Sequence, residues 1–234
     1  MKKRGKLYGI GVGSGDPKRM TLEALETIRQ CDVILLPAES KEACYAYQIV
    51  RQVYPGIEEM PLLCMPFPMT RDEGKLSTAH EQAYLAVSDY LKKGQTVGML
   101  TIGDPGIYST YLYIHKRAKE DGQEAQIING VPSFCSVAAR LGIGLGEKAE
   151  EIHIIPAAYD VTDTMQYHGT CVYMKSGKKL AQLVEALKKQ IETGKEYDIY
   201  AVSDCGMESE KIYIGLEEVA KAKGYLTTVI VKER

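Results

Sequence analysis

Apolar runs alternate with amphipathic stretches along the first half of the chain, and each pattern predicts one kind of element. Apolar runs predict strands at residues 33–36 and 97–102, and residues 6–11 begin as a strand and end in glycines. Apolar residues that recur every three or four positions predict helices at residues 21–30, 43–53, 75–91 and 111–121. In the first of these helices we expect Thr21 as N-cap and Leu22, Leu25 and Ile28 on the buried face, whereas the proline-rich segment 60–69 is expected to be irregular. Because strands alternate with helices, the pattern predicts a parallel sheet with crossover connections.

The second half of the chain is richer in strands. Strands are predicted at residues 125–128, 152–155, 170–174, 197–202, 211–214 and 226–231, and helices at residues 133–141 and 177–192. The composition changes near Gly122, which predicts an N-terminal domain of residues 1–121 and a C-terminal domain of residues 122–234. The predicted fold class is therefore α/β, with two α/β domains and a cleft between them.

Composition and charge narrow the classes of function. Hydrophobic residues make up 45% and charged residues 26% of the 234 residues, as in an ordinary globular protein. The formal net charge of −2 gives no overall attraction to nucleic acid or to an anionic membrane. No apolar run approaches the roughly 20 residues that cross a bilayer, and the glycine-rich segment after the basic start is unlike a signal sequence. We therefore expect a cytoplasmic protein with neither a nucleic-acid nor a membrane partner.

The cysteines and histidines do not form a metal-binding pattern. Six cysteines are spread along the chain without a C-x-x-C pair, at positions 31, 44, 64, 135, 171 and 205. In a cytoplasmic chain such cysteines are expected to be buried thiols. The four histidines show no ligand spacing either, so no metal site is predicted.

The segment Gly103-Asp104-Pro105-Gly106-Ile107-Tyr108-Ser109-Thr110 lies between a predicted strand and a predicted helix. In α/β proteins, loops at the carboxyl ends of strands bind small molecules. Its glycines allow a ligand to approach the backbone, Asp104 offers a carboxylate, and Ser109 and Thr110 offer hydroxyls beside free helix N–H groups. A strand-to-helix turn with a Ser/Thr cap explains the same residues, and the segment by itself does not decide between the two interpretations.

A second glycine cluster covers residues 9–17 and has glycine at every second position from Gly9 to Gly15. A dinucleotide-binding fingerprint requires G-x-G-x-x-G, and this cluster does not match in either register. The segment 176–179 lacks the first glycine and the hydroxyl of a phosphate-binding P-loop, and the chain has no G-x-S-x-G elbow. A structural turn and a ligand-binding loop therefore remain alternatives for the cluster at residues 9–17.

Taken together, these segments resemble the tetrapyrrole methylase family, the class III S-adenosylmethionine-dependent methyltransferases. The matching segments are residues 9–17, 20–22, 31–34, 103–105, 108–110, 130–134, 138–143, 172–175 and 206–210. Within the family, the Gly-Asp-Pro-x-x-Tyr-Ser-Thr and Pro-Ser-Phe forms resemble the branch that methylates C20 of precorrin-2 or cobalt-factor II in cobalamin biosynthesis. Asn129, Gly144 and Ser14 depart from the family pattern, since proline is common at each of these positions.

The resemblance implies two α/β domains, a homodimer, and S-adenosylmethionine bound in the cleft, with S-adenosylhomocysteine as the product. It places the cofactor on Gly103, Asp104, Ile107, Ser109, Thr110, Ser133, Phe134, Met174, Gly206 and Met207. Methyl transfer to an electron-rich carbon requires mainly alignment and desolvation, followed by loss of a proton. Asp104 is the candidate catalytic residue for that proton, with positioning as the alternative. Arg71 and Arg140 are candidate partners of the carboxylates of the tetrapyrrole substrate, with surface solvation as the alternative.

Two further functions are weighed against C20 methylation. The first is methyl transfer to uroporphyrinogen, ribosomal RNA or the diphthamide precursor (diphthine) by an enzyme of the same family. The acidic balance disfavours RNA, and the Tyr-Ser-Thr form disfavours uroporphyrinogen. The second is a nicotinamide-dependent oxidoreductase, which would need the glycine fingerprint that is missing here. Whether the tetrapyrrole already carries cobalt stays open.

Overall fold

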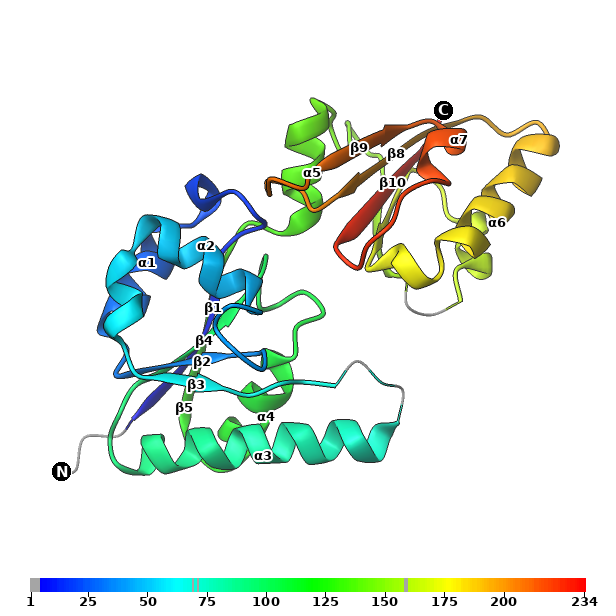
Figure 1. Cartoon of the computed structure of the whole chain (residues 1–234). Coiled ribbons are helices and arrows are strands. Elements are labelled where there is room, and N and C mark those ends of the chain that lie inside the picture. The colour runs from blue at the N-terminus through cyan, green and yellow to red at the C-terminus, as the bar shows by residue number, and fades with distance from the viewer. Residues whose placement is uncertain (1–4, 69, 71, 158–159) are drawn as a thin grey trace. The chain divides into compact units, whose positions relative to one another are not determined.

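A computed structural model describes residues 5–68, 70, 72–157 and 160–234 of the chain. The chain divides into two compact units, of which the first ends at Pro132 and the second begins at Ser133. Each unit contains one five-stranded sheet flanked by helices (Figure 1), which confirms the predicted class of two α/β domains.

The sheet of the first unit has the strand order β3-β2-β4-β1-β5, and all its neighbouring strands are parallel. Its strands are β1 (Lys6–Gly11), β2 (Val33–Leu36), β3 (Leu62–Cys64), β4 (Val97–Thr101) and β5 (Glu124–Ile128). The predicted parallel sheet is thus confirmed. Two 3-10 turns, Pro17–Arg19 and Pro55–Glu59, lie in its connections.

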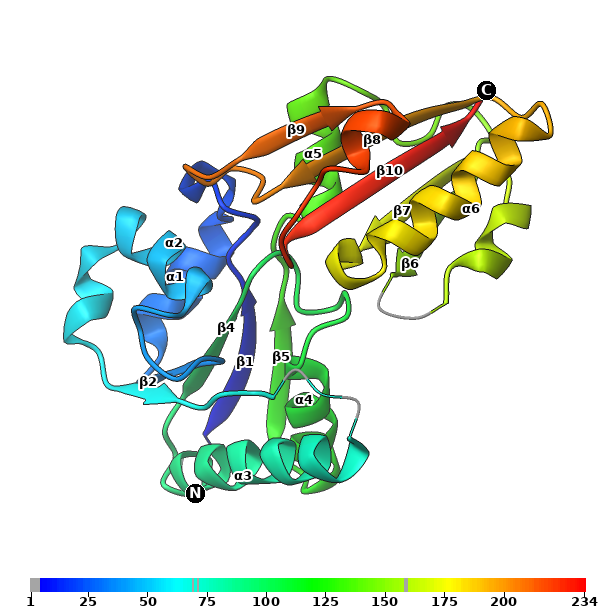
Figure 2. The same cartoon turned by 45° about the vertical axis from the view of Figure 1, so that its right-hand side comes forward.

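Helices cover both faces of this sheet (Figure 2). The helices are α1 (Leu22–Gln30), α2 (Tyr45–Val53), α3 (Glu73–Lys92) and α4 (Tyr111–Glu120). Ile34 and Leu36 of β2 belong to the core shared with α1 and α2, whereas Val33 and Leu35 belong to the core shared with α3 and α4. Since successive side chains of a strand point to opposite faces, a strand buried on both faces needs the uninterrupted apolar run that predicted it.

Two local predictions in the first unit were wrong. Thr21 does cap α1, accepting a hydrogen bond from the Ala24 amide at 3.1 Å, but Leu22 is 79% exposed. Ile28 is buried as predicted, but Ala24 takes the place of Leu22, since residues two positions apart lie on nearly opposite sides of a helix. In the segment predicted to be irregular, β3 pairs with β2, because the prolines flank the three strand residues and do not interrupt them. Residue 69 of that segment lies outside the described residues.

The division between the units falls later than the boundary predicted at Gly122. The reason is β5, which pairs with β1 from Lys6 opposite Glu124 to Ile10 opposite Ile128. Residues 124–128 therefore complete the first sheet, and the segment that follows them leads into the second unit.

The sheet of the second unit has the order β6-β7-β10-β8-β9, in which only the β6–β7 pair is parallel. Its strands are β6 (Ile152–Pro156), β7 (Thr170–Met174), β8 (Tyr197–Ser203), β9 (Lys211–Ile214) and β10 (Thr227–Glu233). Helix α5 (Ser133–Leu141) packs on β10, and α6 (Leu180–Glu192) and α7 (Leu216–Val219) bury Leu183 and Val219 in the core on the other face. The predicted helix at 177–192 starts later, because the 3-10 turn Ser176–Lys178 precedes α6.

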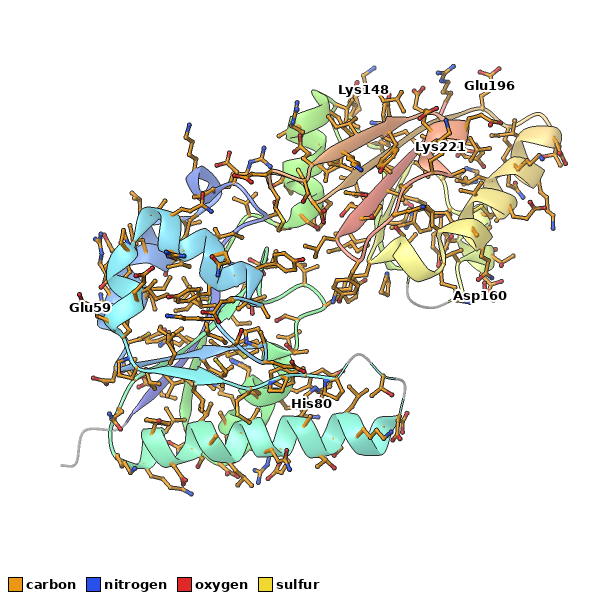
Figure 3. All side chains as sticks on the ribbon, in the orientation of Figure 1. Glu59, His80, Lys148, Asp160, Glu196 and Lys221 are labelled. Carbon is orange, nitrogen blue, oxygen red and sulfur yellow. The ribbon has the colours of Figure 1, made fainter. Side chains whose placement is uncertain are left out.

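Charged side chains cover the outside of both units (Figure 3). Glu59, Glu196 and Lys221, for example, are exposed. None of the helices in the described parts of the chain is long and apolar enough to cross a membrane. Four cysteines are buried as expected, but Cys64 is half-buried and Cys135 is exposed, because Cys135 lies on the outer side of the first turn of α5.

Candidate functional site

The loops that follow β1 and β4 meet at the carboxyl edge of the first sheet. The amide of Gly103 donates to the carbonyl of Gly13 at 2.7 Å, and the Val12 amide donates to the Thr101 carbonyl at 2.9 Å. The chain leaves β1 for α1 on one face of the sheet and leaves β4 for α4 on the other face. This divergence makes the gap between β1 and β4 a topological switch point, where open α/β sheets bind their ligands.

Glycines allow three backbone segments to pack together at this edge. A Cβ atom on Gly130, which follows β5, would lie 2.1 Å from the carbonyl oxygen of Gly103. A Cβ atom on Gly11 would lie 2.5 Å from the amide nitrogen of Gly130. Neither position has room for a side chain, so these glycines of the sequence motifs have a packing role whether or not a ligand binds beside them.

Asp104 connects the loop after β4 to the loop after β5. Its Oδ1 atom accepts a hydrogen bond from the Gly106 amide at 2.7 Å. Its Oδ2 atom accepts two, from the Gly130 amide and from Nδ2 of Asn129, each at 3.1 Å. Asn129 is held in turn by Thr21, whose Oγ1 donates to the Asn129 carbonyl at 3.2 Å. Both oxygens of the predicted catalytic carboxylate therefore fix the position of the loops.

The remaining predicted residues of this loop lead into α4. Ser109 is buried, and its Oγ accepts a hydrogen bond from the Tyr111 amide at 3.1 Å. Of the two hydroxyls predicted to cap α4, that of Ser109 therefore makes the hydrogen bond. Thr110 makes no capping bond with its side chain. Ile107 is half-buried, and Tyr108 has a φ of 48°, a conformation that costs energy for a residue with a side chain and that often occurs at functional sites.

Tyr111 anchors the start of α4 to the sheet. Its hydroxyl donates to the carbonyl of Gln126 at 2.6 Å, and its ring is fully buried. Burial raises the pKa of the Tyr111 phenol, so the group stays protonated as the donor. The loop that carries Ser109 is thus fixed at its helical end as well as at Asp104.

In the second unit the structure brings Ser133 and Met174 to the same residue of β10. Ser133 Oγ lies 3.4 Å from Thr228 Oγ1, and Met174 is the strand partner of Thr228. Met174 and Phe134 are both buried, with 9% and 8% of their surface exposed. Two predicted contacts from the ends of α5 and β7 that are far apart in sequence are therefore neighbours in space.

Gly206 and Met207 lie in the turn between β8 and β9, which is organised by Glu210. Glu210 Oε2 accepts from the Gly206 amide at 2.8 Å, and Oε1 accepts from Arg140 Nε at 2.6 Å. Although burial opposes it, these hydrogen bonds and the charge of Arg140 hold the pKa of Glu210 below its usual value. Arg140 is thus paired inside its own unit, and Arg71 lies outside the described residues. Sequence reasoning included Glu210 in the motif but assigned it no role.

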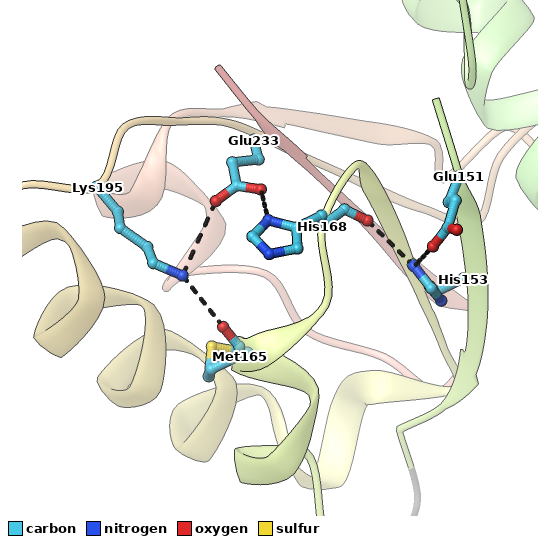
Figure 4. Close-up of polar contacts among 6 residues, drawn as sticks. All are labelled: Glu151, His153, Met165, His168, Lys195 and Glu233. Atoms are coloured by element: carbon cyan, nitrogen blue, oxygen red, sulfur yellow. Dashed lines mark hydrogen bonds and ion pairs between the residues drawn. The ribbon is translucent and has the colours of Figure 1, made fainter. Parts of the chain in front are cut away.

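A second polar cluster lies where β6 and β7 begin, at the other end of the strands of the second sheet from the turn after β8 (Figure 4). His168 Nδ1 is 2.8 Å from Glu233 Oε2, and Lys195 Nζ is 3.8 Å from Glu233 Oε1. His153 Nε2 lies 3.1 Å from the carbonyl of His168 and 3.3 Å from Glu151 Oε2. Within the described residues no three His, Cys, Asp or Glu side chains gather as metal ligands. This cluster pairs its charges internally.

Comparison with known proteins identifies the class of this site. A family model for tetrapyrrole (corrin/porphyrin) methylases matches residues 6–220. A probable cobalt-precorrin-2 C(20)-methyltransferase of Methanocaldococcus jannaschii is 36% identical, over 97% of this chain and 96% of its own. The cobalt-precorrin-2 C(20)-methyltransferase of Salmonella typhimurium is 27% identical, over 98% and 97%. The structure of a Thermus thermophilus uroporphyrin-III C-methyltransferase with S-adenyl homocysteine matches 97% of both chains, with a TM-score of 0.70 and 16% identity.

The structural neighbours share the fold of two α/β units. The chain belongs to the tetrapyrrole (corrin/porphyrin) methylase family. This membership confirms the predicted methyltransferase class and its cofactor, S-adenosylmethionine, and decides against the nicotinamide-dependent alternative.

Proposed function

We propose that this protein transfers the methyl group of S-adenosylmethionine to C20 of cobalt-precorrin-2, or of metal-free precorrin-2, in cobalamin biosynthesis. The observation that carries the proposal is the identity to the C(20)-methyltransferase of M. jannaschii over nearly the full length of both chains. Identity to the uroporphyrin-III enzyme is less than half as high, which disfavours uroporphyrinogen as the substrate. We favour the cobalt-bearing substrate because the relatives from both M. jannaschii and S. typhimurium carry that name.

In the first unit the cofactor is proposed to bind Gly103, Asp104, Ile107, Ser109 and Thr110. The carboxyl edge of the sheet fits a small polar molecule, because Thr110 has a hydroxyl that makes no capping bond. The loop after β1 adds a second polar group, since Ser14 is 4% exposed and its Oγ atom has no hydrogen-bond partner. A buried hydroxyl without a partner is costly, and a bound polar ligand would relieve that cost.

In the second unit Ser133, Phe134, Met174, Gly206 and Met207 are proposed to contribute to cofactor binding. Their arrangement supports this, since the apolar Phe134 and Met174 suit an adenine ring and Ser133 offers a hydroxyl beside Thr228. The Gly206 amide is directed by Glu210 and thereby belongs to a turn of fixed geometry.

The chemistry that the bound cofactor supplies is an electrophilic methyl group on a sulfonium sulfur. The protein contributes alignment, because a carbon nucleophile of a reduced tetrapyrrole needs no activation beyond correct placement and exclusion of water. Asp104 is proposed to serve this alignment by holding Gly106 and Gly130 at Oδ1 and Oδ2. Acceptance of the C20 proton by Asp104 stays a prediction, and Oδ1, which among the described residues accepts only the Gly106 amide, has the lone pair that a proton would need.

We also infer that the protein is a cytoplasmic homodimer, as the family resemblance implies. The edge strand β9 supports a partner surface, because its Ile212 and Ile214 are 38% and 64% exposed. Apolar edge strands are usually covered by another chain or blocked by charge. If this inference is correct, light scattering on the protein as it leaves a size-exclusion column would give twice the chain mass of 25.9 kDa.

The test of the proposed function is an anaerobic methyl-transfer assay with isotope-labelled S-adenosylmethionine. Cobalt-precorrin-2, precorrin-2 and uroporphyrinogen III are supplied separately, and the products are analysed by mass spectrometry. We expect one added methyl group on cobalt-precorrin-2 and none on uroporphyrinogen III. Binding of S-adenosylhomocysteine without transfer to either precorrin would contradict the C20 assignment while leaving the family intact.

A further inference from the structure

The turn between β8 and β9, residues 204–210, contains two hydrogen-bonded carboxylates: Asp204 Oδ2 accepts from Ser209 Oγ at 2.9 Å, and Glu210 accepts a backbone amide. Its backbone is closed by hydrogen bonds from the Met207 amide to the Asp204 carbonyl at 2.9 Å and from the Glu210 amide to the Met207 carbonyl at 3.0 Å. Asp204 has a φ of 51° and Gly206 a φ of 82°, so the chain passes twice through the left-handed region within three residues. The left-handed conformation is costly for Asp204, which has a side chain, although not for glycine, so support from side chains stabilises the turn.

The side chain of Glu210 supplies that support. One carboxylate oxygen accepts the Gly206 amide at 2.8 Å and the other accepts Arg140 Nε at 2.6 Å. The Glu210 side chain is 16% exposed and that of Arg140 is 49% exposed, so the pair is shielded on the side of the carboxylate. Charge-assisted hydrogen bonds of this kind are stronger than neutral ones, and partial burial weakens screening by solvent.

Arg140 joins this turn to a distant segment of the chain. It lies in the last turn of α5, 70 residues before Glu210, and the first residues of the same helix are Ser133 and Phe134. One ion pair therefore connects the helix that carries two proposed cofactor contacts with the turn that carries two others, Gly206 and Met207.

We propose that Glu210 is a positioning residue for the cofactor-binding turn and that Arg140 acts through Glu210. The Arg140 guanidinium orients the Glu210 carboxylate, and the carboxylate orients the Gly206 amide and the start of Met207. This inference rests on the proposed function, because it assumes that Gly206 and Met207 contact S-adenosylmethionine. It also gives Arg140 a different role from the substrate contact that the sequence suggested.

Three variants test the chain of contacts. Arg140→Leu removes the partner of Glu210 Oε1, and Glu210→Gln forces an amide N–H group to face either Arg140 or the Gly206 amide. For both we expect the Kd of S-adenosylhomocysteine, measured by calorimetry without tetrapyrrole, to rise about tenfold, which corresponds to about 1.4 kcal/mol. Arg140→Lys keeps the charge but not the planar donor group, and its Kd should fall between those of Arg140→Leu and the wild type.

Arg234→Leu is the matched control. It removes another arginine–carboxylate pair of the second unit, in which Arg234 Nε donates to Asp198 Oδ1 at 2.9 Å. The control should bind S-adenosylhomocysteine like the wild type. In the turnover assay, Arg140→Leu and Glu210→Gln should raise the KM for S-adenosylmethionine and leave the KM for the tetrapyrrole unchanged. Both variants should melt at the same temperature as Arg234→Leu.

The outcomes separate this inference from the proposed function. Raised Kd values in both variants, with partial recovery in Arg140→Lys, would support the positioning role. Wild-type affinity in Arg140→Leu and Glu210→Gln would overturn it and leave the proposed function standing. A wild-type protein that binds no S-adenosylhomocysteine would overturn the proposed function and this inference with it.

Discussion

Replacement of Asp104 by Asn separates a positioning carboxylate from a catalytic base. The amide can rotate so that its oxygen still accepts from the Gly130 amide and from Asn129, but its nitrogen then faces the Gly106 amide. The variant therefore loses one hydrogen bond to a charged acceptor and weakens two others. A hydrogen bond to a charged group contributes about 1.5–3 kcal/mol to stability. Because Asp104 is only half-buried, we expect the variant to lose about 2 kcal/mol of folding free energy in total, near the lower end of that range.

This loss should appear in stability and in cofactor binding. For a protein of this size about 2 kcal/mol corresponds to a fall of roughly 4–8 °C in melting temperature when the whole chain unfolds in one cooperative transition. We expect the KM for S-adenosylmethionine to rise and kcat to fall by less than about tenfold, because the loop is loosened and no proton acceptor is removed. Asp72→Asn is the control, since Asp72 caps α3 by accepting from the Lys75 amide and Asn caps equally well.

Asn129→Ala completes the test, because it removes a single donor to Asp104 Oδ2 without touching the carboxylate. If Asp104 positions the loop, this variant should show the same changes as Asp104→Asn at about half the size. A base would behave differently: Asp104→Asn would lower kcat about 10²-fold or more, with unchanged affinity for S-adenosylhomocysteine, and Asn129→Ala would be neutral. That pattern would refute the positioning role.

Three further predictions follow from single contacts. Gly130→Ala should abolish binding of S-adenosylhomocysteine and lower the melting temperature, because its Cβ would lie 2.1 Å from the Gly103 carbonyl oxygen. Cys135 should be the first cysteine alkylated by iodoacetamide, as mass spectrometry can show, because it is exposed. Partial desolvation of its sulfur raises the pKa of the thiol, so the rate should go on rising at pH values where an ordinary thiol is already ionised. Glu150→Gln should make the free energy of unfolding, measured by chemical denaturation, less sensitive to pH below 4.5. Although burial raises the pKa of Glu150, hydrogen bonds from Thr170 and other donors outweigh this effect and lower that pKa in the folded protein. The stabilisation by Glu150 is therefore present above pH 4.5 and is lost as the pH falls through the pKa of the folded protein.

The sequence predicted those parts of the fold that depend on local pattern. β1, β2 and α3 were located because apolar runs and helical periodicity are properties of neighbouring residues. β3 was missed because its three residues form a strand only through pairing with β2, which the sequence does not display. The placement of Leu22 on the buried face of α1 was wrong for a related reason, since the small Ala24 packs in the core and Leu22 lies in solvent, whereas Ile28 is buried as predicted.

The candidate site divides in the same way. The strand-to-helix loop at residues 103–110 and the cap at Ser109 could be predicted from composition. The partners of Asp104 could not, because Asn129 is 25 residues away and reaches Asp104 only through the strand order of the sheet. Arg140 and Glu210 are 70 residues apart, and only the folded second unit shows that they are paired.

Asp104 and Glu210 have the same role in the two units. Each carboxylate stands after a strand end, and each accepts the amide of a glycine, Gly130 or Gly206, at a position where a loop must keep one geometry. Both carboxylates act through the loops that they hold, since both oxygens of each accept N–H donors. Such groups suit a reaction in which the nucleophile is already electron-rich and the barrier falls mainly through alignment. Positioning by Asp104 and Glu210 therefore requires no proton transfer at either side chain, and loss of the C20 proton to Asp104 stays the alternative that Asp104→Asn tests.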